Sequence, residues 1–147
     1  MEHRAVYDAA KSAGAREVYI IEEPMAAAIG IRLPIMEPVG SMVIDIGGGT
    51  TDIAVISLSG VVQAKSLKLA GDKMNQDIIN YLRNEFKLQV GEKTAEEIKM
   101  VLGSAKSEER MEHKLKGRDL ISGLPREIMV TDADIRHAIA DSVQAIV

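Results

Sequence analysis

The residues best suited to chemistry form a glycine turn between two apolar runs. The turn and its flanks are, in order, Asp45, Ile46, Gly47, Gly48, Gly49, Thr50, Thr51 and Asp52. The runs on both sides are rich in β-branched residues, which is typical of strands. Glycines let backbone N–H groups approach an anion closely and adopt unusual dihedral angles, and the two threonines add hydroxyls. Asp45 could hold a hydrated Mg²⁺ that bridges to the phosphates. The pattern predicts a phosphate-binding hairpin with Asp45 as its metal partner.

Two better-known glycine motifs are excluded at this turn. A Walker loop needs Gly-Lys-Ser/Thr before a helix, and a Rossmann fingerprint needs spaced glycines that open a helix. The alternative is an ordinary glycine-rich hairpin with a solvated Asp45. Each glycine costs about 0.5–1 kcal/mol relative to Ala in a regular element, so a plain turn would not need three. A phosphate site is the favoured interpretation.

The elements before the turn place a second acidic residue at a junction. Residues 17–21 predict a short strand, and Pro24 opens a helix that ends at Gly30. Glu23 therefore lies at a helix N-terminus directly after a strand, where ligands usually bind in strand-to-helix sheets. An acid at this position can equally be a charge favoured by the helix dipole, so the residue alone is ambiguous.

The second half of the chain predicts alternating strands and helices. A strand at 61–69 precedes Gly71, and an apolar stripe from Met74 to Phe86 predicts an amphipathic helix. Thr94 and Glu97 predict a capping box for the next helix. Glu96 and Lys99, on another face of that helix, are by themselves typical of a weak surface pair.

Charge and turn residues define the last third of the chain. Residues 111–119 predict a solvated edge strand, and 126–130 predict a last short strand. Thr131 and Asp134 predict the cap of a terminal helix. Because helices stand at both ends, and the last one has no stop signal, we expect a fragment of a longer protein.

Composition limits the classes of function. The chain has 147 residues, 46% of them hydrophobic, which suits one sizeable core. A net charge of −4, no Trp and a single Phe disfavour a nucleic-acid surface. The absence of Cys excludes disulfides and thiolate sites, and the three His lack a paired spacing for a metal cluster. No apolar run is long enough to span a membrane, so we expect a soluble protein, and the absence of Cys favours the reducing cytoplasm.

Several segments, in order along the whole chain, resemble the MreB family of bacterial actin homologues, which set rod shape. They are Ile21–Gly30, Asp45–Asp52, Leu69–Asp72, Gly91–Glu96 and Ser122–Arg126. The resemblance implies an α/β fold of the actin-like ATPase (ribonuclease H-like) type, in which two lobes close over Mg-ATP. This chain matches the second lobe. Residues 1–70 and 131–147 would form subdomain IIA, a mixed sheet flanked by helices, and 71–130 the small inserted α/β subdomain IIB.

The resemblance also implies a role for each candidate residue. Asp45 resembles the acidic Mg²⁺ partner, and the turn resembles the second phosphate loop. Glu23 matches the position that orients the attacking water, with Thr50 or Thr51 helping to place it. Glu96 and Lys99 match a helix that faces the ribose and adenine, which replaces the surface interpretation. The implied nucleotide-binding residues are Gly47, Gly48, Gly49, Thr50, Gly71, Asp72, Glu96 and Lys99, and the cofactors are ATP or ADP with Mg²⁺.

The function implied for the intact protein is that of an ATP hydrolase that polymerises into cytoskeletal filaments. Its partners would be other protomers and the proteins of cell-wall synthesis and membrane morphogenesis, but not nucleic acid. The intact protein would be cytoplasmic and membrane-associated, without a direct membrane segment in this chain. Half a cleft should bind nucleotide weakly and be inactive as an ATPase. The alternatives are a lobe of a sugar kinase or heat-shock-chaperone ATPase, and a purely structural piece.

Overall fold

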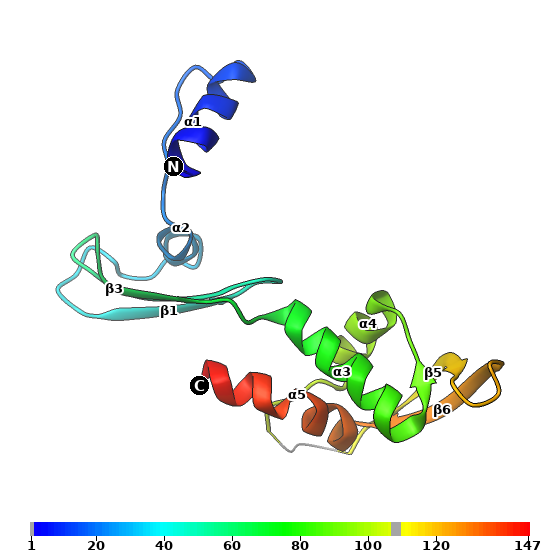
Figure 1. The fold of residues 1–147 in the computed structure, drawn as a ribbon. Helices are drawn as coiled ribbons and strands as arrows, with labels where there is room; N and C mark the ends of the chain where they lie inside the picture. The colour runs from blue at the N-terminus through cyan, green and yellow to red at the C-terminus, as the bar shows by residue number, and fades with distance from the viewer. Residues whose placement is uncertain (1, 107–109) are drawn as a thin grey trace. The chain divides into compact units, whose positions relative to one another are not determined.

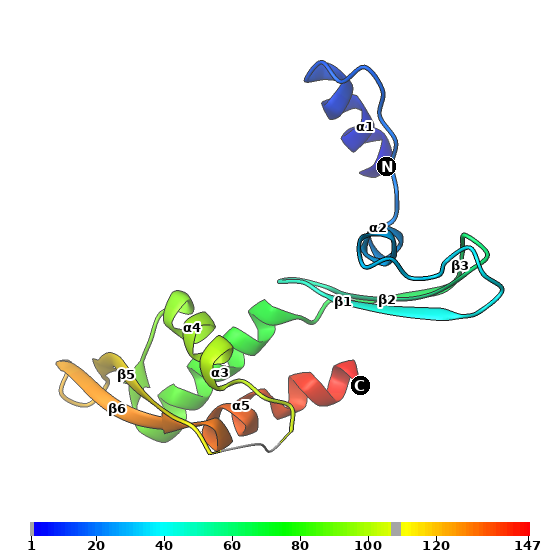
Figure 2. The same cartoon turned by 180° about the vertical axis from the view of Figure 1, so that it is seen from behind.

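The computed structural model describes residues 2–106 and 110–147, which form two compact units (Figure 1, Figure 2). The first unit comprises Met1–Asp45 and Asp52–Lys65, and the second comprises Ile46–Thr51 and Ser66–Val147. The elements in chain order are α1 (Glu2–Ser12), α2 (Glu23–Gly30), β1 (Ser41–Ile46), β2 (Thr51–Ser57), β3 (Gly60–Leu67), α3 (Gly71–Phe86), β4 (Leu88–Gln89), α4 (Glu92–Leu102), β5 (Glu112–Asp119), β6 (Pro125–Thr131) and α5 (Asp132–Ile146).

The first unit packs α2 against a sheet with the strand order β1-β2-β3. Pro24 stands in the first turn of α2, as predicted, because its missing N–H is not needed there. Ala28 is buried with Val43 and Ile56 in a small apolar core. The strand predicted at 17–21 was wrong: these residues are in no regular element, and Tyr19 is 83% exposed. A strand needs a neighbour to pair with, and β-branched side chains alone do not supply one.

The second unit has a larger core, formed where α3 packs between α4, α5 and a second sheet (Figure 2). Its sheet has the order β4-β5-β6, and both pairs are antiparallel. The stripe predicted for α3 is confirmed, because Ile78, Ile79 and Leu82 face the core. Burying such side chains stabilises the fold by about 1.5–3 kcal/mol each.

Local predictions in this unit had mixed outcomes. Among the described residues, β5 pairs with β4 only at Arg118 and Asp119, so most of β5 has β6 as its one neighbour and is an edge strand as predicted, although it buries Leu115. The helix α4 begins at Glu92 with Gly91 as its N-cap, so Thr94 lies inside the helix and caps nothing. The capping box at the start of α5 is present, with Thr131 and Asp134 bonded reciprocally.

Within the two described stretches of the chain, no helix is both long and apolar enough to cross a membrane. The α/β class predicted from the sequence is confirmed by this order of helices and sheets. The proposed boundaries of the two subdomains stay a prediction.

Candidate functional site

The glycine turn joins β1 directly to β2, as the sequence predicts. The N–H of Gly47 donates to the carbonyl oxygen of Thr50 at 2.9 Å and closes the turn. The two threonines that follow the glycines have different surroundings. Thr50 is exposed, whereas Thr51 is fully buried and its Oγ1 donates to the carbonyl oxygen of Leu69 at 2.7 Å. Only the first of these hydroxyls is therefore open to solvent.

The turn is fixed to the beginning of α3 by two backbone hydrogen bonds. The N–H of Gly71 donates to the carbonyl oxygen of Gly47 at 3.0 Å, and the N–H of Asp72 donates to that of Gly48 at 2.9 Å. Both carbonyls thus point toward the helix. Among the described residues of the second unit, the N–H groups of Gly48, Gly49 and Thr50 meet no acceptor. Such a set of free amides beside a helix N-terminus suits an anion.

Close approach, rather than unusual dihedral angles, explains the glycines. The glycines of the turn do not adopt positive φ angles, so the dihedral argument was wrong for them. A Cβ at Gly48 would lie 3.2 Å from Oδ1 of Asp72, and one at Gly71 would lie 3.3 Å from the carbonyl oxygen of Gly47. A Cβ at Gly49 would meet no atom within 4 Å. A Cβ at Gly48 in the turn or at Gly71 in α3 would therefore be tightly placed, while Gly49 faces open space.

Two side chains of α4 reach the same region. The Nζ of Lys99 donates to Oε2 of Glu96 at 2.7 Å and to the carbonyl oxygen of Gly71 at 3.2 Å. The side chain of Lys99 is 17% exposed and that of Glu96 is 45% exposed. The hydrogen bond from Lys99, and then that from Asn75, lowers the pKa of the Glu96 carboxyl, so it is ionised at neutral pH. The pair is part of a network and not the isolated surface contact that its spacing suggests.

A pocket of about 530 Å³ lies between these groups in the second unit. It is lined by Ile46, Gly47, Gly48, Gly71, Asp72, Met74, Glu96 and Lys99. Six of the predicted nucleotide-binding residues therefore line one pocket, with the glycine turn and the Glu96–Lys99 pair of α4 among its walls. Gly49 and Thr50 belong to the turn but do not line the pocket. Glu23, which is exposed, and Asp45, which is half-buried on β1, belong to the first unit, and their roles stay predictions.

Sequence reasoning missed Asn75, which joins α3 to the pair on α4. Its side chain is buried, and Nδ2 donates to Oε2 of Glu96 at 2.7 Å. A signal was available: Asn75 stands three residues before Ile78 and four before Ile79, so it occupies a position of the buried stripe. A polar residue on an apolar stripe normally has a specific partner.

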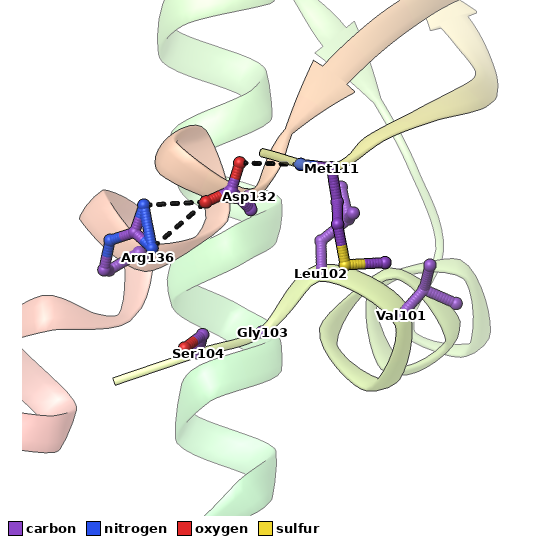
Figure 3. A pocket seen from close by; sticks show the side chains of 7 residues that line it. All are labelled: Val101, Leu102, Gly103, Ser104, Met111, Asp132 and Arg136. Atoms are coloured by element: carbon purple, nitrogen blue, oxygen red, sulfur yellow. Dashed lines mark hydrogen bonds and ion pairs between the residues drawn. The ribbon is translucent and has the colours of Figure 1, made fainter. Parts of the chain in front are cut away.

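A larger pocket, of about 590 Å³, lies elsewhere in the second unit (Figure 3). Oδ1 of Asp132 accepts from the N–H of Met111 at 3.2 Å, and Oδ2 accepts from both terminal nitrogens of Arg136 at 2.8 and 3.1 Å. Both oxygens are thus bonded within the chain, which explains the buried pair as a structural link between α5 and the start of β5. None of the predicted site residues lies there.

Comparisons with known proteins agree with the resemblance. The model of the family described as MreB/Mbl protein matches residues 1–147. The chain is 47% identical to the cell shape-determining protein Mbl of Bacillus subtilis and 49% identical to the cell shape-determining protein MreB of Escherichia coli K12. These matches cover 100% of this chain but only 44% and 43% of those proteins.

Solved structures give the same result. The crystal structure of MreB 5 of Spiroplasma citri bound to AMPPNP matches with a TM-score of 0.94 at 40% identity, over 99% of this chain and 44% of that one. The structure of the same protein bound to ADP matches equally well. The chain thus spans less than half the length of these relatives. A family match over its whole length argues against the sugar kinase and chaperone alternatives, and the chain belongs to the MreB/Mbl family of actin-like, cell shape-determining proteins.

Proposed function

We propose that this chain is the nucleotide-binding lobe of an actin-like ATPase whose filaments control bacterial rod shape. The observation that carries the proposal is the pocket that brings the glycine turn and the Glu96–Lys99 pair together. The match to an MreB 5 structure bound to AMPPNP and to one bound to ADP supports it. The chain would take ATP or ADP with Mg²⁺.

The glycine turn would bind the phosphates. The N–H groups of Gly48, Gly49 and Thr50 supply donors, and the positive end of the α3 dipole favours an anion beside Gly71. Asp72 contributes an opposing negative charge, since its carboxylate lies next to Gly48. Phosphates therefore need a cation to be bound here strongly.

The donor groups fit Mg²⁺ shared with phosphates and not a cage made of protein alone. The described residues contain no cluster of three His, Asp or Glu side chains. Mg²⁺ usually keeps several waters and binds one or two carboxylates together with substrate phosphates. Asp45, two residues before Gly47, is the proposed carboxylate, and bound Mg²⁺ would neutralise charge on the phosphates.

The pair on α4 would bind the nucleoside. Oε2 of Glu96 is occupied by donors from Lys99 and Asn75, which leaves Oε1 to accept from a ribose hydroxyl. An ionised carboxylate makes stronger hydrogen bonds to hydroxyls than a neutral acceptor does. Lys99 acts mainly within the protein, because its Nζ already contacts Glu96 and the carbonyl oxygen of Gly71.

Hydrolysis is proposed for the intact protein only. Glu23 would accept a proton from the attacking water, and Thr50 would help to place that water because its hydroxyl is exposed. Thr51 would hold the start of β2, since its hydroxyl is bonded to Leu69. The chain alone would bind weakly and not turn over.

The intact protein would bind its own protomers and the proteins of cell-wall synthesis and membrane morphogenesis, at the cytoplasmic face of the membrane. The division into subdomain IIA (1–70 and 131–147) and subdomain IIB (71–130) is part of the same proposal. The similarity to actin-like relatives supports these assignments.

Calorimetric titration of the purified chain with Mg-ADP tests the nucleotide site. We expect saturable binding weaker than micromolar, because half of the cleft is absent from this chain. Glu96→Ala should weaken binding about tenfold, since it removes a hydrogen bond to a charged group. Glu97→Ala is the matched control: the same change at the next, exposed position of α4 should have no effect. Absence of binding at millimolar Mg-ADP, or equal losses in both variants, would contradict the proposal.

A further inference from the structure

Asn75 places a polar side chain with one unpaired atom in the core of the second unit, which is unfavourable for folding. Its side chain is 3% exposed, and Oδ1 is the one buried side-chain oxygen of the described residues that has no hydrogen-bond partner. An apolar residue of similar size would fill the same stripe position without leaving an oxygen unpaired. What Asn75 adds is a donor, because Nδ2 bonds to Glu96.

That donor controls which oxygen of Glu96 is free. Oε2 accepts from Asn75 on α3 and from Lys99 on α4, each at 2.7 Å. Two donors from two helices hold one oxygen and so fix the rotation of the carboxylate. Within the part of the chain that the structure describes, no donor contacts Oε1, and Glu96 lines the pocket with its side chain 45% exposed.

We infer that Asn75 is a positioning residue for the nucleoside: it holds Glu96 with Oε1 directed to a ribose hydroxyl. The inference rests on the proposed nucleotide site and goes beyond it, because Asn75 does not line the pocket. The depressed pKa of Glu96 agrees with this arrangement, since Lys99 and Asn75 both stabilise its ionised form.

The same geometry explains why position 75 holds a neutral amide and not a carboxylate. A carboxylate at position 75 would lie within hydrogen-bond distance of Glu96, and two ionised carboxylates cannot share that contact. One of them would have to take up a proton. The other charged groups that line the pocket are Asp72 and Lys99.

The test measures the affinity for a nucleoside and the affinity for a phosphate ligand in separate titrations. Wild type, Asn75→Leu and Asn80→Leu are titrated by NMR with adenosine and, separately, with Mg-pyrophosphate. We expect Asn75→Leu to weaken adenosine binding about tenfold and to leave pyrophosphate binding within twofold. Asn80→Leu, the same change at an exposed position of α3, should alter neither. Thermal unfolding should show Asn75→Leu at least as stable as wild type, because the unpaired oxygen is gone.

Three results would overturn the inference. Adenosine affinity in Asn75→Leu equal to wild type would show that the donor does not position the binding oxygen. Equal losses for adenosine and pyrophosphate would indicate a general structural role. Wild type that binds neither ligand would instead refute the proposed function, and the inference with it, so the two failures are distinguishable.

Asn75→Asp keeps the inference testable if the leucine variant does not fold. This variant retains the size of the side chain but provides a donor only when a proton is shared with Glu96. We expect adenosine binding at least fivefold weaker than wild type at pH 7.5 and recovery to within twofold at pH 5. An affinity ratio that does not change between these pH values would overturn the inference.

Discussion

Gly49→Ala separates what the fold requires of the glycine turn from what a ligand requires. The added methyl group would meet no protein atom within 4 Å, and the backbone at Gly49 has no positive φ. Nothing in the surrounding protein therefore opposes the substitution. If the turn binds phosphate, the methyl group would instead occupy space that a phosphate oxygen needs.

The two expected effects have opposite signs. A Gly→Ala change at a compatible backbone position stabilises a protein by about 0.4–1 kcal/mol, because the unfolded chain loses freedom. In a chain of this size, that raises Tm by roughly 1–4 °C. Losing one N–H contact to a charged phosphate oxygen costs about 1.5–3 kcal/mol, which weakens Mg-ADP binding roughly ten- to a hundredfold.

The assays are differential scanning calorimetry for Tm and isothermal titration with Mg-ADP for affinity. Gly48→Ala is the control, since its methyl carbon would lie 3.2–3.3 Å from both carboxylate oxygens of Asp72. That variant should be less stable than Gly49→Ala. If wild type binds Mg-ADP measurably and Gly49→Ala binds it with the same affinity, the assignment of the turn as the phosphate-binding site is refuted. A fall in Tm would refute the claim that the space is open.

Three further predictions concern the second unit. Backbone N–H groups of the following turn, and then Arg126, lower the pKa of Asp119 from 3.8 to about 2. The ionised carboxylate therefore stabilises the fold fully above pH 4, and this stabilisation is lost as pH falls toward 2. In acid titrations of unfolding, the free energy of unfolding of Asp119→Asn should fall less steeply over this range than that of wild type. Burial, and then the hydrogen bond to Asp134, raises the pKa of Tyr81 from 10.0 to about 12. The neutral phenol therefore stabilises the fold fully below pH 10, and this stabilisation is lost as pH rises through 12. In alkaline titrations of unfolding, Tyr81→Phe should remove this dependence of the free energy of unfolding on pH. Thr131→Ala removes the cap of α5 and should reduce the free energy of unfolding by about 1 kcal/mol in urea titrations.

Local signals predicted the parts of this fold that local contacts determine. The cap of α5 depends on residues three positions apart, and both Thr131 and Asp134 make the expected bonds. The strand predicted at 17–21 failed because pairing depends on a distant neighbour. The two-residue strand β4 was missed for the same reason, since only its pairing with β5 defines it.

The candidate site was predictable only where its chemistry lies in one segment. The glycine turn is continuous in sequence, and its free amides follow from that segment. Glu96 and Lys99 needed the family resemblance, because their spacing alone indicates a surface pair. Asn75 was missed because its partner Glu96 is 21 positions away. Its position on the apolar stripe was the one local sign.

Gly71 explains how these separate segments become one site. Its carbonyl oxygen accepts from Lys99, and its N–H donates to the carbonyl oxygen of Gly47, so one residue joins α4 to the glycine turn. A Cβ there would lie 3.1 Å from Nζ of Lys99 and 3.3 Å from that carbonyl oxygen, which leaves little room for any side chain. Lys99 also holds Glu96, so the carboxylate proposed for the nucleoside and the turn proposed for the phosphates are connected through this one glycine.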